Sequence, residues 1–138
     1  MLDKDFKNIK NEMDYLHELI DKATDNYNRR GFENNQVYDR LERFLGSLET
    51  VSEFISHMNK EFIEGYLIKS ENGIFELPEA DYTLTCGSRI EVFVSPYDGE
   101  EKKWCNGRVE HDSDSYYFCN CDGEDADLKE GMKVRIRF

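Results

Sequence analysis

The sequence predicts an α+β fold in which an antiparallel helical hairpin precedes a small antiparallel β sheet. Three observations support this prediction. Apolar residues recur every three or four positions in the first half, they alternate with polar residues in the second half, and Asn72-Gly73 marks a tight turn within that second pattern. We expect the helical hairpin to occupy residues 1–64 and the all-β domain residues 65–138, because the periodicity changes near Glu64-Gly65.

Two seven-residue repeats predict the two helices. The interval from Tyr27 to Glu33 separates them, and no proline interrupts either run, so we expect the two apolar stripes to pack against each other. Phe44, Leu45 and Phe54 widen the second stripe, which predicts a further contact with the β half or with another copy of the chain. The first stripe is Phe6, Ile9, Met13, Leu16, Ile20, Ala23 and Tyr27, and the second is Val37, Leu41, Phe44, Leu48, Val51, Ile55, Met58 and Phe62.

About six short strands are expected in the β half. Two of them flank Asn72-Gly73, and the next three are contained in RIEVFVS, KWCNGRVEH and SYYFCNC. In the last, MKVRIRF, apolar residues face one side and Lys133, Arg135 and Arg137 face the other. A meander of this length buries its apolar side by curling into a small barrel-like or rolled sheet, or by packing on the helices.

The chain is strongly acidic, with 30 Asp and Glu against 18 Lys and Arg and a formal net charge of −12. This charge repels phosphate backbones, so direct nucleic-acid binding is not expected and a basic protein partner is favoured, although acidic surfaces are also common on soluble proteins. No apolar run reaches the roughly 18–20 residues of a membrane span, and the N-terminus lacks the apolar region of a signal peptide. We expect a cytoplasmic protein with no membrane association and with reduced thiols.

The stretch VEHDSDSYYFCNCDGEDADL, residues 109–128, concentrates one histidine, two cysteines and seven carboxylates. Cys119 and Cys121 would share one face of a strand, and Cys86 and His111 would complete a zinc site. No Cys-x-x-Cys pair is present, however, so ordinary reduced thiols are favoured and no metal or other cofactor is expected. Gly123 is misplaced for a calcium loop, and no nucleophile or phosphate-binding motif occurs, so we do not expect an enzyme.

Several segments of the second half occur in a recognisable order: YLIKSENGIFEL, LTCGSRIEVFV, Trp104, GRVEHDSDSYYF and LKEGMKVRIRF. Together they resemble an uncharacterised family, a domain of unknown function from Gram-positive bacteria and their mobile genetic elements. The most specific part is the set Trp104, Gly107, Arg108, Glu110, His111 and Asp112. The resemblance implies no catalytic residues. It implies a setting in which small acidic proteins block host defence or tune transfer.

The leading expectation is therefore a non-enzymatic acidic binding protein of a mobile element. It would dock on a basic, nucleic-acid-handling protein, for example as an inhibitor of a host-defence enzyme such as a CRISPR effector, with carboxylates held where phosphates would lie. The residues expected to make this contact are Asp98, Glu100, Glu101, Asp112, Asp114, Asp122, Glu124, Asp125 and Asp127.

Two alternatives remain at this point. In the first, the helical hairpin is the functional half and acts as an interaction module or homodimer interface. In the second, a small β barrel binds nucleic acid through Lys133, Arg135 and Arg137, with Trp104 and Arg108 nearby. A terminal strand that alternates Lys and Arg is also typical of a solvated face or of an edge protected against aggregation.

Overall fold

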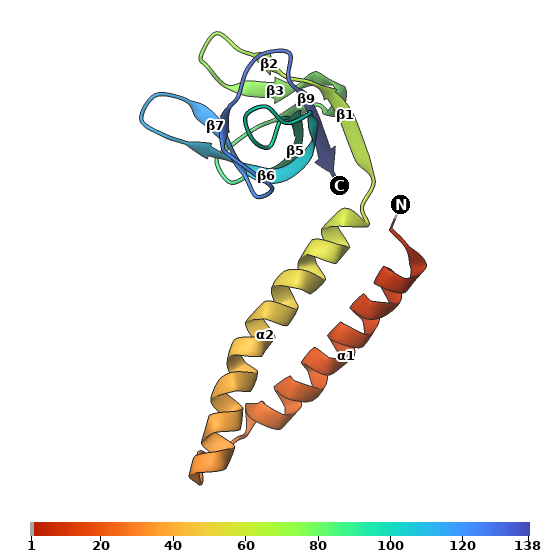
Figure 1. Ribbon diagram of the computed structural model, residues 1–138, viewed down its shortest axis with the longest axis vertical. Helices are drawn as coiled ribbons and strands as arrows, with labels where there is room; N and C mark the ends of the chain where they lie inside the picture. The colour runs from red at the N-terminus through yellow and green to blue at the C-terminus, as the bar shows by residue number, and fades with distance from the viewer. Residues whose placement is uncertain (1) are drawn as a thin grey trace. The chain divides into compact units, whose positions relative to one another are not determined.

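The computed structural model describes residues 2–138, which form two compact units divided between Lys60 and Glu61 (Figure 1). The first unit contains helices α1 (Lys4–Asp25) and α2 (Phe32–Met58). The second contains a short 3-10 helix, η1 (Pro78–Ala80), and the strands β1 (Phe62–Tyr66), β2 (Ile68–Lys69), β3 (Phe75–Leu77), β4 (Tyr82–Thr83), β5 (Arg89–Val94), β6 (Lys103–His111), β7 (Tyr116–Asn120), β8 (Ala126–Asp127) and β9 (Lys133–Arg137).

The two helices pack antiparallel, as the sequence predicts. Asp3 caps α1 by accepting a hydrogen bond from the backbone N–H of Asp5 at 2.8 Å. The rings of Tyr27 and Tyr38 stack 5.0 Å apart next to the connection, which reaches α2 through Gly31 at a φ of 78°. Within residues 2–138, no helix is long and apolar enough to cross a membrane.

The seam between the helices differs from the predicted one. Its buried residues are Ile20, Leu45 and Leu48, with Met13 and Leu41 packed against them. On each helix, the predicted apolar stripe is wider than one seam can bury. Each helix therefore presents only one edge of its stripe to the other helix. The residues of the other edge are exposed: Ile9, Leu16, Ala23, Val37, Phe44 and Val51. Phe6, near the start of α1, is exposed as well.

The second helix is shorter than the repeat predicts. It ends at Met58, where the backbone N–H of Asn59 donates to the carbonyl of Ile55 at 3.1 Å. The prediction that Phe62 is helical is wrong, because Phe62 begins β1 and every residue of that strand pairs with β9. Backbone pairing with β9 therefore determines the conformation of Phe62, although Phe62 follows Ile55 by the seven residues of the helical repeat.

The β unit contains two antiparallel sheets. Six strands form one sheet in the order β1-β9-β5-β6-β7-β8, and β2, β3 and β4 form the other. The predicted α+β fold is confirmed. The larger sheet curls, as Figure 1 shows, but it is not closed, since β1 and β8 are its edges. The strand count exceeds the predicted six because β1 lies mostly in the segment expected to be helical, and because β4 and β8, of two residues each, are too short to show any alternation.

One hydrophobic core joins the two sheets. The alternation predicted for β5 and β9 is confirmed, since Ile90, Val92 and Val94 point inward together with Val134 and Ile136. The predicted hairpin around Asn72-Gly73 is also confirmed, and it delivers β3 to the same core. The other buried members of the core are Leu67, Phe75, Leu77, Leu84, Cys105, Val109, Phe118 and Leu128.

Gly107 in β6 leaves no room for a side chain. A Cβ at this position would overlap the carbonyl oxygen of Cys119 and the ring of Phe118, which is fully buried. We expect Gly107→Ala to lower the free energy of unfolding of the β unit by about 1–3 kcal/mol, the usual cost of overpacking. Urea unfolding followed by the fluorescence of Trp104, the only tryptophan of the chain, measures this loss.

Gly65→Ala in β1 is the matched control. The three atoms nearest to its Cβ would all belong to the side chain of Glu79, which is flexible and can move away. The loss for Gly65→Ala should therefore be clearly smaller than for Gly107→Ala, and equal losses would contradict the packing argument.

Candidate functional site

Three turns of the β unit carry the acidic residues that the sequence predicts as a partner-binding set. Asp98, Glu100 and Glu101 lie between β5 and β6, Asp112 and Asp114 lie between β6 and β7, and Asp122, Glu124 and Asp125 lie between β7 and β8. Asp127, predicted in the same turn, instead lies within β8 opposite Tyr117. All nine residues are exposed.

The three turns lie next to one another in the folded unit. The backbone N–H of Glu124 donates to the carbonyl of Pro96 at 2.7 Å, which fastens the third turn to the first. Asp112, Asp125 and Asp127 line one shallow hollow of about 340 Å³ with Tyr117, which connects the second turn to the third. We call the nine carboxylates of these turns and of β8 the acidic rim.

Three members of the acidic rim hold the turns in shape. Two backbone N–H groups bind the Asp112 carboxylate, and these bonds hold the pKa of Asp112 below its usual value. Asp112 accepts from the N–H groups of Asp114 and Ser115 at 2.9 Å each, Asp122 accepts from that of Asn106 at 2.7 Å, and Asp125 accepts from that of Asn120 at 2.9 Å.

The remaining rim carboxylates are available to a partner. Across residues 2–138, the side chains of Asp98, Glu100, Glu101 and Glu124 make no hydrogen bond or ion pair. Burial raises the pKa of the neighbouring Tyr117, with the charges of Cys119 and Asp125 adding to the effect. The acidic rim therefore combines carboxylates that are free to bind a partner with three others, Asp112, Asp122 and Asp125, that hold its turns in place.

The outer face of the larger sheet gathers four of the five residues predicted as an alternative nucleic-acid face. The Arg135 guanidinium lies 3.9 Å from the ring centroid of Trp104 and 4.3 Å from that of Phe62. Lys133 lies over Trp104 at 5.8 Å, and Arg137 lies over Phe62 at 5.2 Å. The fifth residue, Arg108, is instead bound by Glu110 at 2.5 Å.

Carboxylates from neighbouring strands pair with each of the three cations of this face. Glu64 in β1 binds Lys133 at 3.1 Å and Arg135 at 3.0 Å, and these two bonds lower the pKa of Glu64. Glu91 in β5 binds Arg137 at 2.6 Å, and both side chains of this pair are buried. A phosphate would have to displace a carboxylate from each of the three cations, so this arrangement favours a structural role.

Sequence reasoning did not assign a role to Glu64 or Glu91, and it placed Phe62 in the apolar stripe of the second helix. Glu91 is the only acidic residue of β5 and points to its outer side. The neighbouring strand, β9, alternates basic and apolar residues. That pairing of a lone acid with a basic strand is the signal that would have identified the buried ion pair.

Comparison with known proteins places the β unit in a family. A family described as a domain of unknown function (DUF5348) matches residues 65–136, just over half of the chain. The chain belongs to this family. The match covers almost the whole β unit, including all three turns of the acidic rim. No curated protein and no solved structure matches the chain.

The thiols of the DUF5348 domain are dispersed. In the conceivable zinc site, His111 would have to lie across from the Cys119–Cys121 pair, but in the ladder His111 faces Tyr116 and Cys119 faces Arg108. Cys86 donates to a Glu110 carboxylate oxygen at 3.3 Å, and Cys105 is buried in the core. Among residues 2–138, no group of three or more His, Cys, Asp or Glu side chains is arranged to hold a metal ion.

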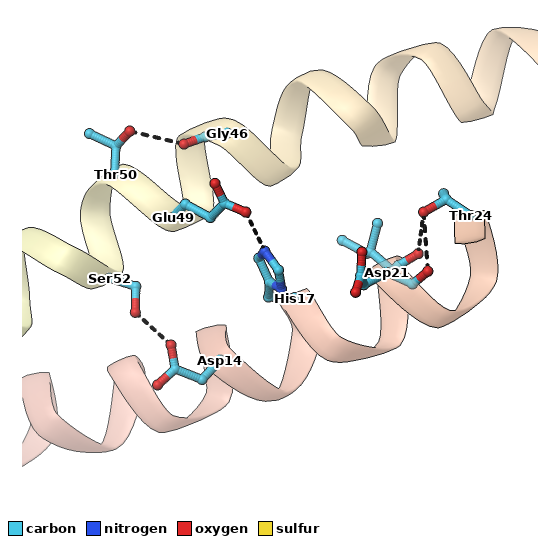
Figure 2. A network of polar contacts seen from close by, with 9 residues as sticks. Asp14, His17, Asp21, Thr24, Gly46, Glu49, Thr50 and Ser52 are labelled. Atoms are coloured by element: carbon cyan, nitrogen blue, oxygen red, sulfur yellow. Dashed lines mark hydrogen bonds and ion pairs between the residues drawn. The ribbon is translucent and has the colours of Figure 1, made fainter.

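A polar groove of about 390 Å³ follows one side of the hairpin seam, outside the DUF5348 domain. Figure 2 shows its two cross-helix contacts: His17 Nε2 lies 2.7 Å from Glu49 Oε1, and Ser52 donates to Asp14 at 2.5 Å. The imidazole and the hydroxyl are thus bound to different carboxylates. These two contacts join α1 to α2 along the polar side of the seam.

Breaking the buried pair of Glu91 and Arg137 should strongly destabilise the DUF5348 domain. Glu91→Ala removes the carboxylate from a guanidinium that is only 9% exposed, and such a loss costs about 3–5 kcal/mol. Glu64→Ala, on the more exposed side of the same cationic row, is the matched control and should cost much less. Urea unfolding followed by far-UV circular dichroism compares the two variants, and similar losses would contradict the assigned role of Glu91.

The His17–Glu49 contact should make hairpin stability depend on pH. The hydrogen bond to Glu49 raises the pKa of His17 above its usual value of 6.5. Its contribution is therefore fully present below pH 6.5 and is lost as the pH rises through the raised pKa. The difference in helix melting temperature between the native chain and His17→Gln should shrink as the pH is raised through this window. A difference that stays constant, or grows with pH, would contradict the contact.

Proposed function

We propose that this protein is a non-enzymatic binding protein whose β unit docks on a basic, nucleic-acid-handling protein through the acidic rim. The observation that carries the proposal is the continuity of the rim. The turn that contains Glu124 is bonded to Pro96 in the next turn, and Asp112 and Asp125 share one hollow. Separate acidic turns would offer weak, scattered charge, whereas a continuous rim offers a defined surface.

The mechanism requires charge that is held in place before binding. Asp112, Asp122 and Asp125 bond to backbone N–H groups and shape the turns, and the free carboxylates stand on those turns. A positively charged channel that normally accepts a phosphate backbone attracts such a rim at long range. Because the turns that carry the charges are already ordered, little backbone entropy is lost on docking.

The proposed setting is a mobile genetic element of a Gram-positive bacterium, with action in the cytoplasm. There, a protein that occupies a nucleic-acid channel would inhibit a host-defence enzyme, and a CRISPR effector is the first partner class to test. The net charge of −12 supports this choice, since a nucleic-acid channel is basic and recruits an acidic competitor by the same attraction.

Charge reversal within the rim should abolish docking without unfolding the domain. The informative variant is the triple substitution Glu100→Lys, Glu101→Lys and Glu124→Lys, because these side chains support no turn. Immobilised full-length chain should retain basic, nucleic-acid-handling proteins from a Gram-positive lysate at low salt and release them at high salt. We expect the triple variant to lose this retention at least about tenfold.

The matched control carries the same change of charge elsewhere, as Glu42→Lys, Glu53→Lys and Glu71→Lys, all on exposed positions outside the rim. Retention by the control should stay close to that of the native chain, and added duplex DNA should compete with the native chain for the retained proteins. Retention that both triple variants reduce equally, or that does not respond to salt, would contradict the proposal.

A further inference from the structure

One face of the helical hairpin is apolar and uncovered. Positions seven residues apart lie on the same side of a helix, with a drift of about 20° per repeat. Ile9, Leu16 and Ala23 therefore form a line along α1, and Val37, Phe44 and Val51 form a line along α2. Both lines flank the seam, since the buried seam residues Ile20, Leu45 and Leu48 are their near neighbours in the helical repeat.

The two lines lie on the same side of the hairpin. Ala23 is the last residue of the line on α1, and Val37 is the first residue of the line on α2. Both line one hollow next to the connection between the helices, together with Leu41. The polar groove of His17, Glu49 and Ser52 follows the opposite side of the seam, on different residues. The hairpin thus has one polar face, closed by hydrogen bonds, and one apolar face that extends for about 21 Å from Ile9 to Ala23.

The hairpin has little core of its own. Its buried apolar residues among residues 2–60 are Ile20, Leu45 and Leu48, although it contains two helices of 22 and 27 residues. Most helical stability in proteins comes from packing of an apolar face, and a unit of this size needs more burial than one narrow seam provides. The exposed lines are the apolar surface from which that burial can come.

We infer that a second copy of this chain covers the apolar face, so that two hairpins form a four-helix bundle. The second copy brings two lines with the same seven-residue period and the same spacing, which is what helix packing with a left-handed supercoil requires. A face that pairs with itself about a twofold axis closes into a dimer and leaves no surface for further growth.

The size of the face matches a homodimer interface. Leu19 lies beside the α1 line, three residues after Leu16 and four before Ala23, and extends the face. Six residues of the face are 39–57% exposed and leave on the order of 500 Å² of apolar surface uncovered: Ile9, Leu16, Leu19, Val37, Phe44 and Val51. An ordinary interface covers about 800 Å² per subunit, and about 65% of a homodimer interface is apolar. The apolar area that one hairpin offers is therefore the area that one subunit of a stable dimer supplies.

Sedimentation equilibrium of the full-length chain over a dilution series tests this inference. We expect a species of twice the 16.3 kDa chain mass that dissociates on dilution. Phe44→Ala should raise the dissociation constant at least about tenfold, since it truncates an aromatic residue at the centre of the face. Alanine favours the helix, so the variant retains its fold. Thr50→Ala, exposed on another side of α2, is the matched control and should leave the dissociation constant unchanged.

The outcomes separate this inference from the proposed function. A native chain that stays monomeric at every concentration overturns the inference, whether the β unit or a foreign protein covers the face. A dimer whose dissociation constant changes equally with Phe44→Ala and Thr50→Ala overturns it too. The triple rim variant should dimerise like the native chain, so loss of docking and loss of dimerisation are independent results.

Discussion

The β unit depends on strand β9, because one side of this strand packs in the core and the other side forms ion pairs with both neighbouring strands. It lies between β1 and β5, and its Val134 and Ile136 side chains fill the core. Its cations point the other way and take carboxylates from both neighbours, Glu64 from β1 and Glu91 from β5. Pairing β1 with β9 brings together the two ends of the unit, which costs loop-closure entropy. The buried ion pair, and the contacts of Arg135 and Arg137 with the rings of Trp104 and Phe62, stabilise the pairing of β9 that closes this loop.

The same two-sided requirement explains which strands the sequence predicts. In β5 and β9 apolar side chains that point inward alternate with charged or aromatic side chains that point outward, so the alternation is visible without coordinates. Strand β1 carries no such pattern, since Phe62, Ile63 and Tyr66 are all largely exposed and Gly65 has no side chain. Its conformation comes from its partner strand. The seven-residue spacing that links Phe62 to Ile55 therefore predicted a helix that tertiary pairing overrides.

The hairpin and the rim illustrate two further limits of sequence reasoning. The spacing in α1 and α2 correctly predicts the helices and their antiparallel contact, but a stripe wider than one seam does not determine which edge is buried. The bonds of His17 and Ser52 across the seam fix that rotation, and they join residues far apart in sequence. The acidic turns were predictable from composition, whereas the bond from Asn106 N–H to Asp122 depends on the pairing of β6 with β7.

The two proposed surfaces depend on different forces, and this difference constrains how they would act together. Attraction between the rim and a basic partner is screened over about 8–10 Å at moderate ionic strength. Burial of the apolar hairpin face is not weakened by salt in this way. A dimer joined by its hairpins would keep two rims on one particle under conditions that weaken each single contact. Against a partner with two basic sites, the second rim would bind at a raised effective concentration, and a modest affinity per rim would give tight overall binding. Against a partner with a single channel, the second rim would add only a statistical factor of about two. Dimerisation through the helical hairpin would therefore strengthen binding by the acidic rim only when the partner has more than one basic site.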